Sequence, residues 1–314
     1  MMKRIIPFKE LESRLQMVER ITESCDFFSA KQFATKENNK LLLHADEEIY
    51  FPFFKSSPTP KKGDKLYRIT KYFLGMDTER IASFLYPPKP IARGGRCNIP
   101  RNPVFYCSHQ PFFSLLETLQ GIEFNNSKEV FFLSEWEISR EKNWSMLGIL
   151  LDKAIPPENN YYSVCLNHYG EYKQKFLSSG FSTRDFITQN EFLHTQFLKN
   201  GDHRFSSISS HEFLYGESGQ NDLVIYPSVQ GEKRQSNLAF NTRSLHGDIK
   251  FNYAIGFCIT DFTTTNGMNF FVTGKAKLES RGSLLWSDLT IRESQKLLTL
   301  FAQDYNFAIN PITF

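Results

Sequence analysis

Short strand-like runs alternate with helical patterns along most of the chain, and this alternation limits the fold more than any other feature. Apolar runs of strand length occur at residues 66–70, 104–107, 130–138, 223–226, 251–262 and 269–278. Between them, residues 110–120 and 182–199 repeat apolar side chains at helical spacing. Because strands and helices interleave, the sequence predicts a mixed α/β or α+β domain, in which the last two strands can pair.

The two helical patterns differ in how clearly they begin. In the second pattern Ser182 is a capping residue, and Asp185 three positions later completes a capping box. Its residues Phe186, Leu193 and Phe197 share one face, so we expect a helix from Ser182 that buries this face. In the first pattern the predicted apolar face consists of Phe113, Leu116 and Leu119.

A linker is predicted at residues 56–64, SSPTPKKGD, where two prolines, a glycine and lysines follow one another. Before it, the first 24 residues repeat apolar side chains at helical spacing: Phe8, Leu11, Leu15, Val18 and Ile21. The sequence therefore predicts an N-terminal helical extension and linker at residues 1–63 and a main domain at residues 64–314. The apolar face of the extension fits packing within the chain, the commoner case, or a partner or dimer contact.

Composition excludes several classes of protein. The chain has 314 residues, 40% of them hydrophobic and 31 of them Phe, which is enough for a large core and too apolar for a disordered chain. No apolar run is long enough to span a membrane, and the basic start lacks the apolar stretch of a secretory signal. The net charge of +3 is too balanced to indicate nucleic-acid binding, so none is expected.

The cysteines and histidines show no metal-binding or disulfide pattern. Five cysteines are scattered without a CxxC pair, and the seven histidines lack an HExxH spacing. We therefore expect neither a disulfide framework nor a metal site, and a reducing, cytoplasmic location.

Four short segments carry residues suited to chemistry. Arg68 lies in an apolar strand, where it either faces solvent at an edge or grips phosphate with its planar guanidinium. Gly94, Gly95, Arg96 and Asn98 form a loop that is either a simple turn or an anion-binding site built from main-chain N–H groups and guanidinium.

The other two segments contain a glutamate and a serine. Glu117 ends the apolar helical run that follows Tyr106, and it is either a surface residue or a pocket residue that stabilises a cationic transition state. Ser228 follows a strand and Pro227, either as a turn serine or projecting from the carboxyl end of a sheet. No GxSxG pattern surrounds it, so a hydrolase-type nucleophile is not expected.

In order and spacing, these segments resemble the RES domain. The shared pattern is YR, then GGRxN, then VFYxS with a glutamate eleven residues past the tyrosine, then IYPS and a downstream NLAF. RES domains are known chiefly as toxins paired with Xre-type antitoxins. The resemblance implies a compact fold akin to ADP-ribosyltransferase toxins, with NAD as substrate and no resident cofactor.

The resemblance also assigns residues. The family arginine, glutamate and serine fall on Arg68, Glu117 and Ser228 as catalytic residues. Substrate binding falls on Tyr106 and on the loop residues Gly94, Gly95, Arg96 and Asn98. Two features depart from the family pattern: Cys97 stands where a Trp is common, and residues 143–219 hold additional helices.

The expected activity is cleavage of the nicotinamide–ribose bond of NAD, by hydrolysis or phosphorolysis, in a toxin or abortive defence effector. Two alternatives stay open: a protein ADP-ribosyltransferase, and a catalytically silent RES-like module that binds a nucleotide or a partner. The resemblance further implies an Xre-type antitoxin as a possible partner and a homo-oligomer as a possible assembly. No membrane association is expected.

Overall fold

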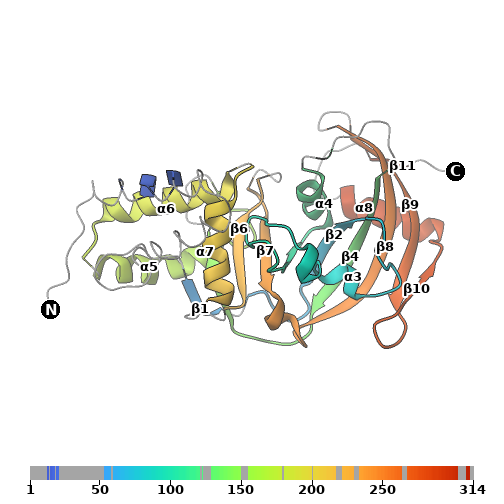
Figure 1. Cartoon of the computed structure of the whole chain (residues 1–314), viewed down its shortest axis with the longest axis horizontal. Coiled ribbons are helices and arrows are strands. Elements are labelled where there is room, and N and C mark those ends of the chain that lie inside the picture. Colours follow the sequence, from blue (N-terminus) through green and yellow to red (C-terminus); the bar gives the residue numbers. More distant parts are fainter. Residues whose placement is uncertain are drawn as a thin grey trace. The chain divides into compact units, whose positions relative to one another are not determined.

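The computed structural model describes residues 13, 15–17, 19–20, 53–57, 59–120, 122, 129–149, 155–178, 180–199, 201–216, 221–229, 233–263, 267–302 and 309–311. Within these ranges the protein is a mixed α/β protein, as predicted (Figure 1). The chain forms two compact units, each built from three separate stretches. The first unit is Met1–Thr59, Pro87–Phe105 and Lys142–Ser244, and the second is Pro60–Tyr86, Tyr106–Glu141 and Leu245–Phe314.

The sheet of the first unit contains β1 (Phe53–Ser57), β5 (Trp144–Gly148), β6 (Leu223–Pro227) and β7 (Ser236–Asn241) in that order. The β5–β6 pair is parallel, whereas β1–β5 and β6–β7 are antiparallel. Every residue of β6 and β7 is buried. Parallel neighbours need a long crossover connection, and three helices supply it here.

The crossover helices are α5 (Tyr162–Ser178), α6 (Thr183–Leu198) and α7 (Arg204–Tyr215). Within this unit α5 packs beside α6, and α7 packs against β6 (Figure 1). The predicted start of α6 is confirmed. The Ser182 hydroxyl accepts from the Asp185 N–H at 3.2 Å, and the Asp185 carboxylate accepts from the Ser182 N–H at 2.7 Å. This reciprocal pair satisfies two donors that the first turn leaves open.

The N-terminal segment packs against these helices. The described residues between positions 13 and 20 are helical, as the apolar spacing predicts. Leu15 is buried in a hydrophobic cluster of seven residues, which also contains Tyr172, Phe176, Phe186 and Leu193. Glu19 accepts a hydrogen bond from Gln196 Nε2 at 2.7 Å. At Leu15 the apolar face is therefore used for packing within the chain. Phe8, Leu11, Val18 and Ile21 lie outside the described residues.

The second unit contains β2 (Lys65–Lys71), β4 (Glu129–Ile138), β8 (Ile249–Thr263), β9 (Gly267–Leu278) and β10 (Leu284–Ser287), in the order β2-β4-β8-β9-β10. All these neighbours are antiparallel, and β11 (Ile309–Pro311) pairs in parallel with β9. The predicted pairing of the last two long strands is thus confirmed as β8–β9.

The remaining elements are short. β3 (Val104–Ser108) begins in the first unit and ends in the second, where Ser108 pairs with Tyr67. The second unit also holds α3 (Ala82–Leu85), α4 (Pro111–Leu119) and α8 (Ile291–Ala302). The described residues also form two 3₁₀ turns, η2 (Lys89–Ile91) and η3 (Thr242–Leu245).

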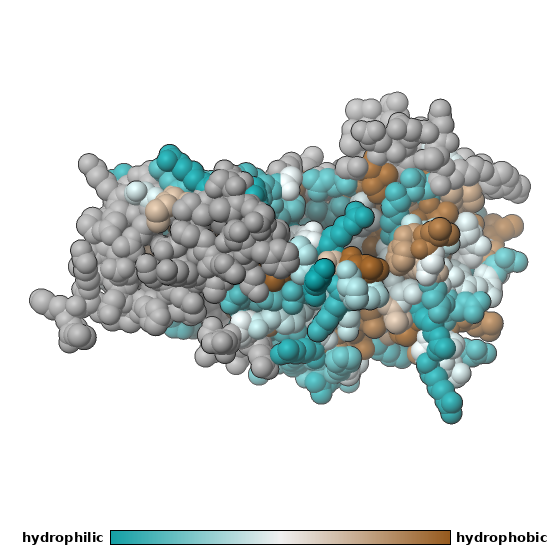
Figure 2. Space-filling view, viewed as in Figure 1, coloured by the Kyte–Doolittle hydropathy of each residue, from teal (hydrophilic) through white to brown (hydrophobic). Residues whose placement is uncertain are grey.

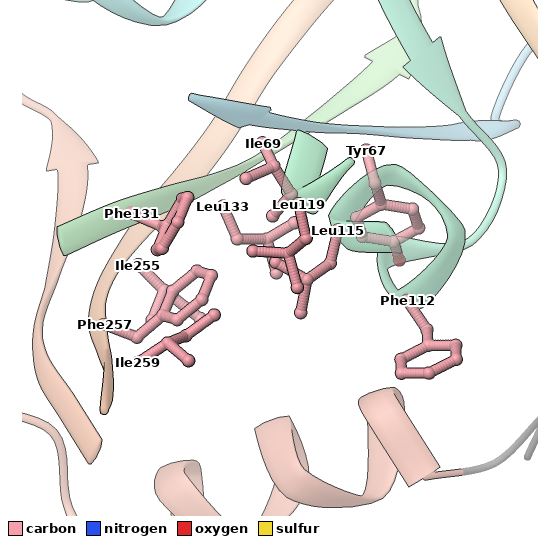
Figure 3. Packing of buried hydrophobic residues seen from close by; sticks show 10 residues of the cluster. All are labelled: Tyr67, Ile69, Phe112, Leu115, Leu119, Phe131, Leu133, Ile255, Phe257 and Ile259. Atoms are coloured by element: carbon pink, nitrogen blue, oxygen red, sulfur yellow. The ribbon is translucent and has the colours of Figure 1, made fainter. Parts of the chain in front are cut away.

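Helix α4 covers one face of the β2–β4–β8 sheet (Figure 3). Its residues Phe112, Leu115 and Leu119 meet the strand residues of the cluster: Tyr67, Ile69, Phe131, Leu133, Ile255, Phe257 and Ile259. Of the predicted face, Leu119 lies in this cluster, Leu116 packs against it, and Phe113 is buried outside it. The helix therefore buries side chains on more than one face, whereas the sequence predicted a single apolar face of Phe113, Leu116 and Leu119.

The surface of the second unit is not uniformly polar. Brown apolar areas appear among teal and white ones where Figure 1 labels β8 to β10 (Figure 2). Large apolar side chains of this unit that are exposed include Phe73, Leu74, Leu285 and Ile291. In the described part of the chain, no helix is both long enough and apolar enough to cross a membrane.

The unit boundaries do not follow a single division of the sequence. One boundary, between Thr59 and Pro60, falls inside the predicted linker at residues 56–64. Residues 64–314, predicted as the main domain, are shared between both units. The sequence indicates only the boundary at the linker. The other boundaries arise because later stretches of the chain pack with earlier stretches of the same unit, and no local sequence signal marks them.

Candidate functional site

The predicted site residues fall in both units. Arg68, Tyr106 and Glu117 belong to the second unit, whereas Gly94, Gly95, Arg96, Asn98 and Ser228 belong to the first.

Arg68 projects from β2 on the face opposite to Tyr67 and Ile69, since neighbouring strand residues alternate between faces. Its side chain is half-buried, and Nη1 donates to the main-chain oxygen of Tyr106 at 3.1 Å. Burial lowers the pKa of Arg68 to about 10, and the neighbouring Cys107 and Tyr106 oppose this shift in part. The guanidinium is thus withdrawn from water, unlike that of an edge-strand arginine facing solvent.

Tyr106 meets Arg68 through its backbone. It lies on β3 and is half-buried, and its carbonyl oxygen is the acceptor for the guanidinium 38 residues earlier in the chain. Two of the predicted site residues from separate motifs are therefore in direct contact in the second unit.

Glu117 lies on α4 and is half-buried. At about 100° per residue it is turned about 200° from Leu115, so it points away from the core face of the helix. The helix is tied to β2 because the Ser114 hydroxyl donates to the Tyr67 oxygen at 2.7 Å. This bond fixes the helix, and hence the Glu117 backbone, relative to the strand that carries Arg68.

A second carboxylate of this unit was not predicted. Glu135 on β4 is 9% exposed and accepts from the Tyr253 hydroxyl at 2.6 Å and from Asn252 Nδ2 at 3.0 Å. Burial, and next Glu135, raise the pKa of the Tyr67 phenol. Nothing in the local sequence marks Glu135, because both of these donors lie on β8, more than 110 residues later in the chain.

In the first unit the glycine loop is a tight turn. Gly95 and Asn98 exchange two main-chain hydrogen bonds, at 2.9 and 3.4 Å. The Asn98 amide donates to the oxygens of Arg93 at 2.8 Å and Ile99 at 3.1 Å, so it braces the turn itself. The Ser207 hydroxyl of α7 donates to the Gly95 oxygen. Neither Gly94 nor Gly95 has a positive φ, so the turn does not need glycine for a left-handed backbone.

Arg96 binds the C-terminal end of α6. Only 6% of it is exposed, and Nη1 donates to the main-chain oxygens of Phe197 and, at 3.2 Å, Lys199. A guanidinium is favourable there because the last carbonyls of a helix lack partners and carry partial negative charge. The central guanidinium carbon of Arg96, Cζ, also lies 5.7 Å from the centre of the Tyr226 ring. The sequence predicts a pyrophosphate ligand at this position; the structure shows that Nη1 holds the loop to α6.

Ser228 is fully buried directly after β6. Its main-chain N–H donates to the main-chain oxygen of Gln235 at 2.8 Å. Its main-chain oxygen accepts from the Lys233 N–H, also at 2.8 Å. By alternation its side chain shares a face with Tyr226, the residue beneath Arg96. The loop at 94–98 and the end of β6 therefore meet at Tyr226 within the first unit.

Asn159 supports the turn that follows Ser228. It is 2% exposed, its Nδ2 donates to the Lys233 oxygen at 2.8 Å, and its Oδ1 accepts from the Ser236 hydroxyl at 2.7 Å. The sequence marks Asn159 only as part of a polar stretch before α5. Its partners lie more than 70 residues later, so sequence reasoning had no signal for this role.

His203 is expected to make the stability of the protein depend on pH. Burial, and next the Arg96 guanidinium, lower the pKa of His203 from 6.5 to about 4, so the imidazole is neutral at pH 7. The unfolded chain binds more protons between these two values, and stability is expected to fall as the pH drops from about 6.5 to about 4. Melting temperatures measured over this range test the effect.

The His203→Gln variant is expected to lose less stability than the wild type over the same pH range. His168→Gln, on α5, serves as the control and is expected to follow the wild type. Parallel curves for the wild type and His203→Gln would contradict the assignment.

The motifs are therefore assembled in two groups, Arg68 with Tyr106 in the second unit and the 94–98 loop with the end of β6 in the first. No protein-family model matches the chain, and no curated protein matches it.

Proposed function

We propose that this protein has a RES-like fold and consumes NAD by cleaving its nicotinamide–ribose bond, as a toxin or abortive defence effector. The observation that carries the proposal is that motifs far apart in the sequence come into contact inside each unit. Arg68 of the YR motif binds Tyr106 of the VFYxS motif at 3.1 Å. The guanidinium carbon of Arg96 in the GGRxN motif lies 5.7 Å from the ring centre of Tyr226 in the IYPS motif.

The chemistry asks mainly for electrostatic stabilisation. The nicotinamide ring of NAD carries a positive charge and leaves as a neutral molecule, so little acid catalysis is needed. The transition state is a ribosyl oxocarbenium ion, which a nearby carboxylate stabilises. In this proposal Glu117 binds the ribose hydroxyls and opposes the developing positive charge.

Arg68 binds the pyrophosphate in this proposal. Its planar donor fork suits phosphate oxygens, and its contact with the Tyr106 oxygen orients the guanidinium. Because the guanidinium is partly withdrawn from water, an anion beside it gains more than it would in bulk solvent. Tyr106 packs on the nicotinamide or the ribose and excludes water.

In the first unit, the roles of Gly94 and Gly95 in substrate binding and of Ser228 in catalysis rest on the resemblance alone. Arg96 and Asn98 hold the loop in shape through the contacts to α6 and to Arg93. An Xre-type antitoxin and a homo-oligomeric assembly belong to the same proposal and rest on the resemblance alone.

The test is nicotinamide release from NAD by the purified full-length protein, with and without inorganic phosphate. We expect release by the wild type, and a dependence on phosphate would identify phosphorolysis rather than hydrolysis. A folded protein that releases no nicotinamide, even after any copurified partner has been removed, would contradict the proposal.

Labelled NAD separates the remaining outcomes. Label transferred to protein would identify an ADP-ribosyltransferase. Binding of NAD without release or transfer would identify a silent binding module.

A further inference from the structure

The serine of the VFYxS motif, Ser108, is buried inside the second unit, with 1% of the residue exposed. Its hydroxyl oxygen lies 2.8 Å from that of Ser114 on α4, a residue that is 7% exposed. Ser114 in turn donates to the main-chain oxygen of Tyr67 at 2.7 Å. These two residues, the serine pair, therefore join the end of β3, the first turns of α4 and β2 within one unit.

The direction of these bonds follows from the number of hydrogens. A hydroxyl has one hydrogen, and that of Ser114 goes to Tyr67, so the Ser114 oxygen accepts from Ser108. The Ser108 hydrogen lies between this oxygen and the main-chain oxygen of Gln110, and the Ser108 oxygen accepts from the Gln110 N–H at 3.3 Å. Ser108 thus holds the Ser114 hydroxyl in the orientation that binds β2, and a buried network with its partners in place is rigid.

The serine pair lies between two of the residues that the proposed reaction uses. The Tyr67 carbonyl that accepts from Ser114 belongs to the same planar peptide unit as the N–H of Arg68. In the other direction, Glu117 follows Ser114 by three residues on α4, a rise of about 4.5 Å along the helix. The pair therefore connects the backbone of Arg68 to the helical turn that carries Glu117.

We propose that Ser108 and Ser114 are positioning residues, which fix α4 on β2 and so set the place of the Glu117 carboxylate relative to Arg68. The inference rests on the proposed function, and all of its residues belong to the second unit. The backbone of Arg68 is also held by the pairing of β2 with β4, where it lies opposite Ser134. Loss of the serine pair is therefore expected to displace the carboxylate and to leave the arginine in place.

The experiment introduces Ser114→Ala into the wild type and into Glu117→Gln, and measures nicotinamide release by the full-length protein well below its melting temperature. In the wild-type background, kcat is expected to fall about tenfold with little change in KM, because a misplaced carboxylate weakens the transition state rather than substrate binding. In the Glu117→Gln background, the same change is expected to leave kcat unaltered, because the charge that the pair positions is already absent.

Two further variants complete the comparison. Thr118→Val is the matched control, because the Thr118 hydroxyl bonds back to the Ser114 main-chain oxygen at 2.8 Å, within α4 itself. It is expected to keep the wild-type kcat. Ser108→Ala removes the support of the Ser114 hydroxyl and keeps its bond to Tyr67, so a smaller fall in kcat is expected. Should Ser114→Ala fail to fold, Ser108→Ala provides the same comparison in the two backgrounds.

Wild-type kcat in the folded alanine variant would overturn the inference and leave the proposed function standing. An equal fall in kcat in both backgrounds would also overturn it, because the pair would then act independently of Glu117. The same holds for an equal fall in Thr118→Val, since any disturbance of α4 would then suffice. A wild type that releases no nicotinamide would remove the proposed function, and this inference with it.

Discussion

Glu117→Gln is expected to lower the rate of nicotinamide release by a factor of about 10² to 10³, or roughly 3–4 kcal/mol in activation free energy. The glutamine keeps the shape of the side chain and removes the charge that opposes the ribosyl cation. Turnover at saturating NAD measures the effect, because the lost interaction belongs to the transition state rather than to substrate binding.

The fold is expected to survive this change. Glu117 points away from the core face of α4, and the helix is held by Ser114 and by its apolar residues Phe112, Leu115 and Leu119. Glu171→Gln, an exposed helical glutamate on α5, serves as the control and should match the wild type in both turnover and melting temperature. Wild-type turnover in folded Glu117→Gln would end the assignment of this residue.

Arg68→Lys is expected to raise the KM for NAD by about 10- to 100-fold, the range that follows from losing a hydrogen bond to a charged group. Lysine keeps a positive charge but not the planar fork, and it cannot reproduce the bond to the Tyr106 oxygen together with a two-oxygen grip on phosphate. Burial also disfavours the charged form of a lysine more readily than that of an arginine. Steady-state kinetics over a range of NAD concentrations measure the shift.

Arg80→Lys provides the comparison, since Arg80 is an exposed arginine of the same unit. It should leave the KM unchanged. If Arg68→Lys also leaves the KM unchanged, Arg68 has a structural role and the pyrophosphate is bound elsewhere.

Elements with a local signal were predictable from the sequence. The capping box at Ser182 is decided within four residues, so both its partners are visible at once. The strands at β2, β3 and β6 and the helix α4 follow from apolar periodicity over a few residues. The same local character explains why the β8–β9 pairing could be anticipated from two adjacent strand-like runs.

Long-range contacts were not predictable. Arg96 and its acceptor Phe197 are 101 residues apart, so nothing near Arg96 indicates that it holds the end of a helix. The bridge from Asn159 to Ser236 and the donors around Glu135 have the same origin.

The order in which the chain contributes to its two units has a consequence for folding during synthesis. The chain changes unit five times, after residues 59, 86, 105, 141 and 244. Domains made of one continuous stretch fold as soon as they emerge, in order from the N-terminus. Here the first unit lacks β7 until residue 241 has been made, and the second unit lacks β8 and β9 until residue 278. β2 can pair with β4 once residue 138 has been made, but β4 must wait for its other neighbour, β8, until residue 263. A nascent chain therefore keeps one edge of β4 unpaired until most of the protein has been translated.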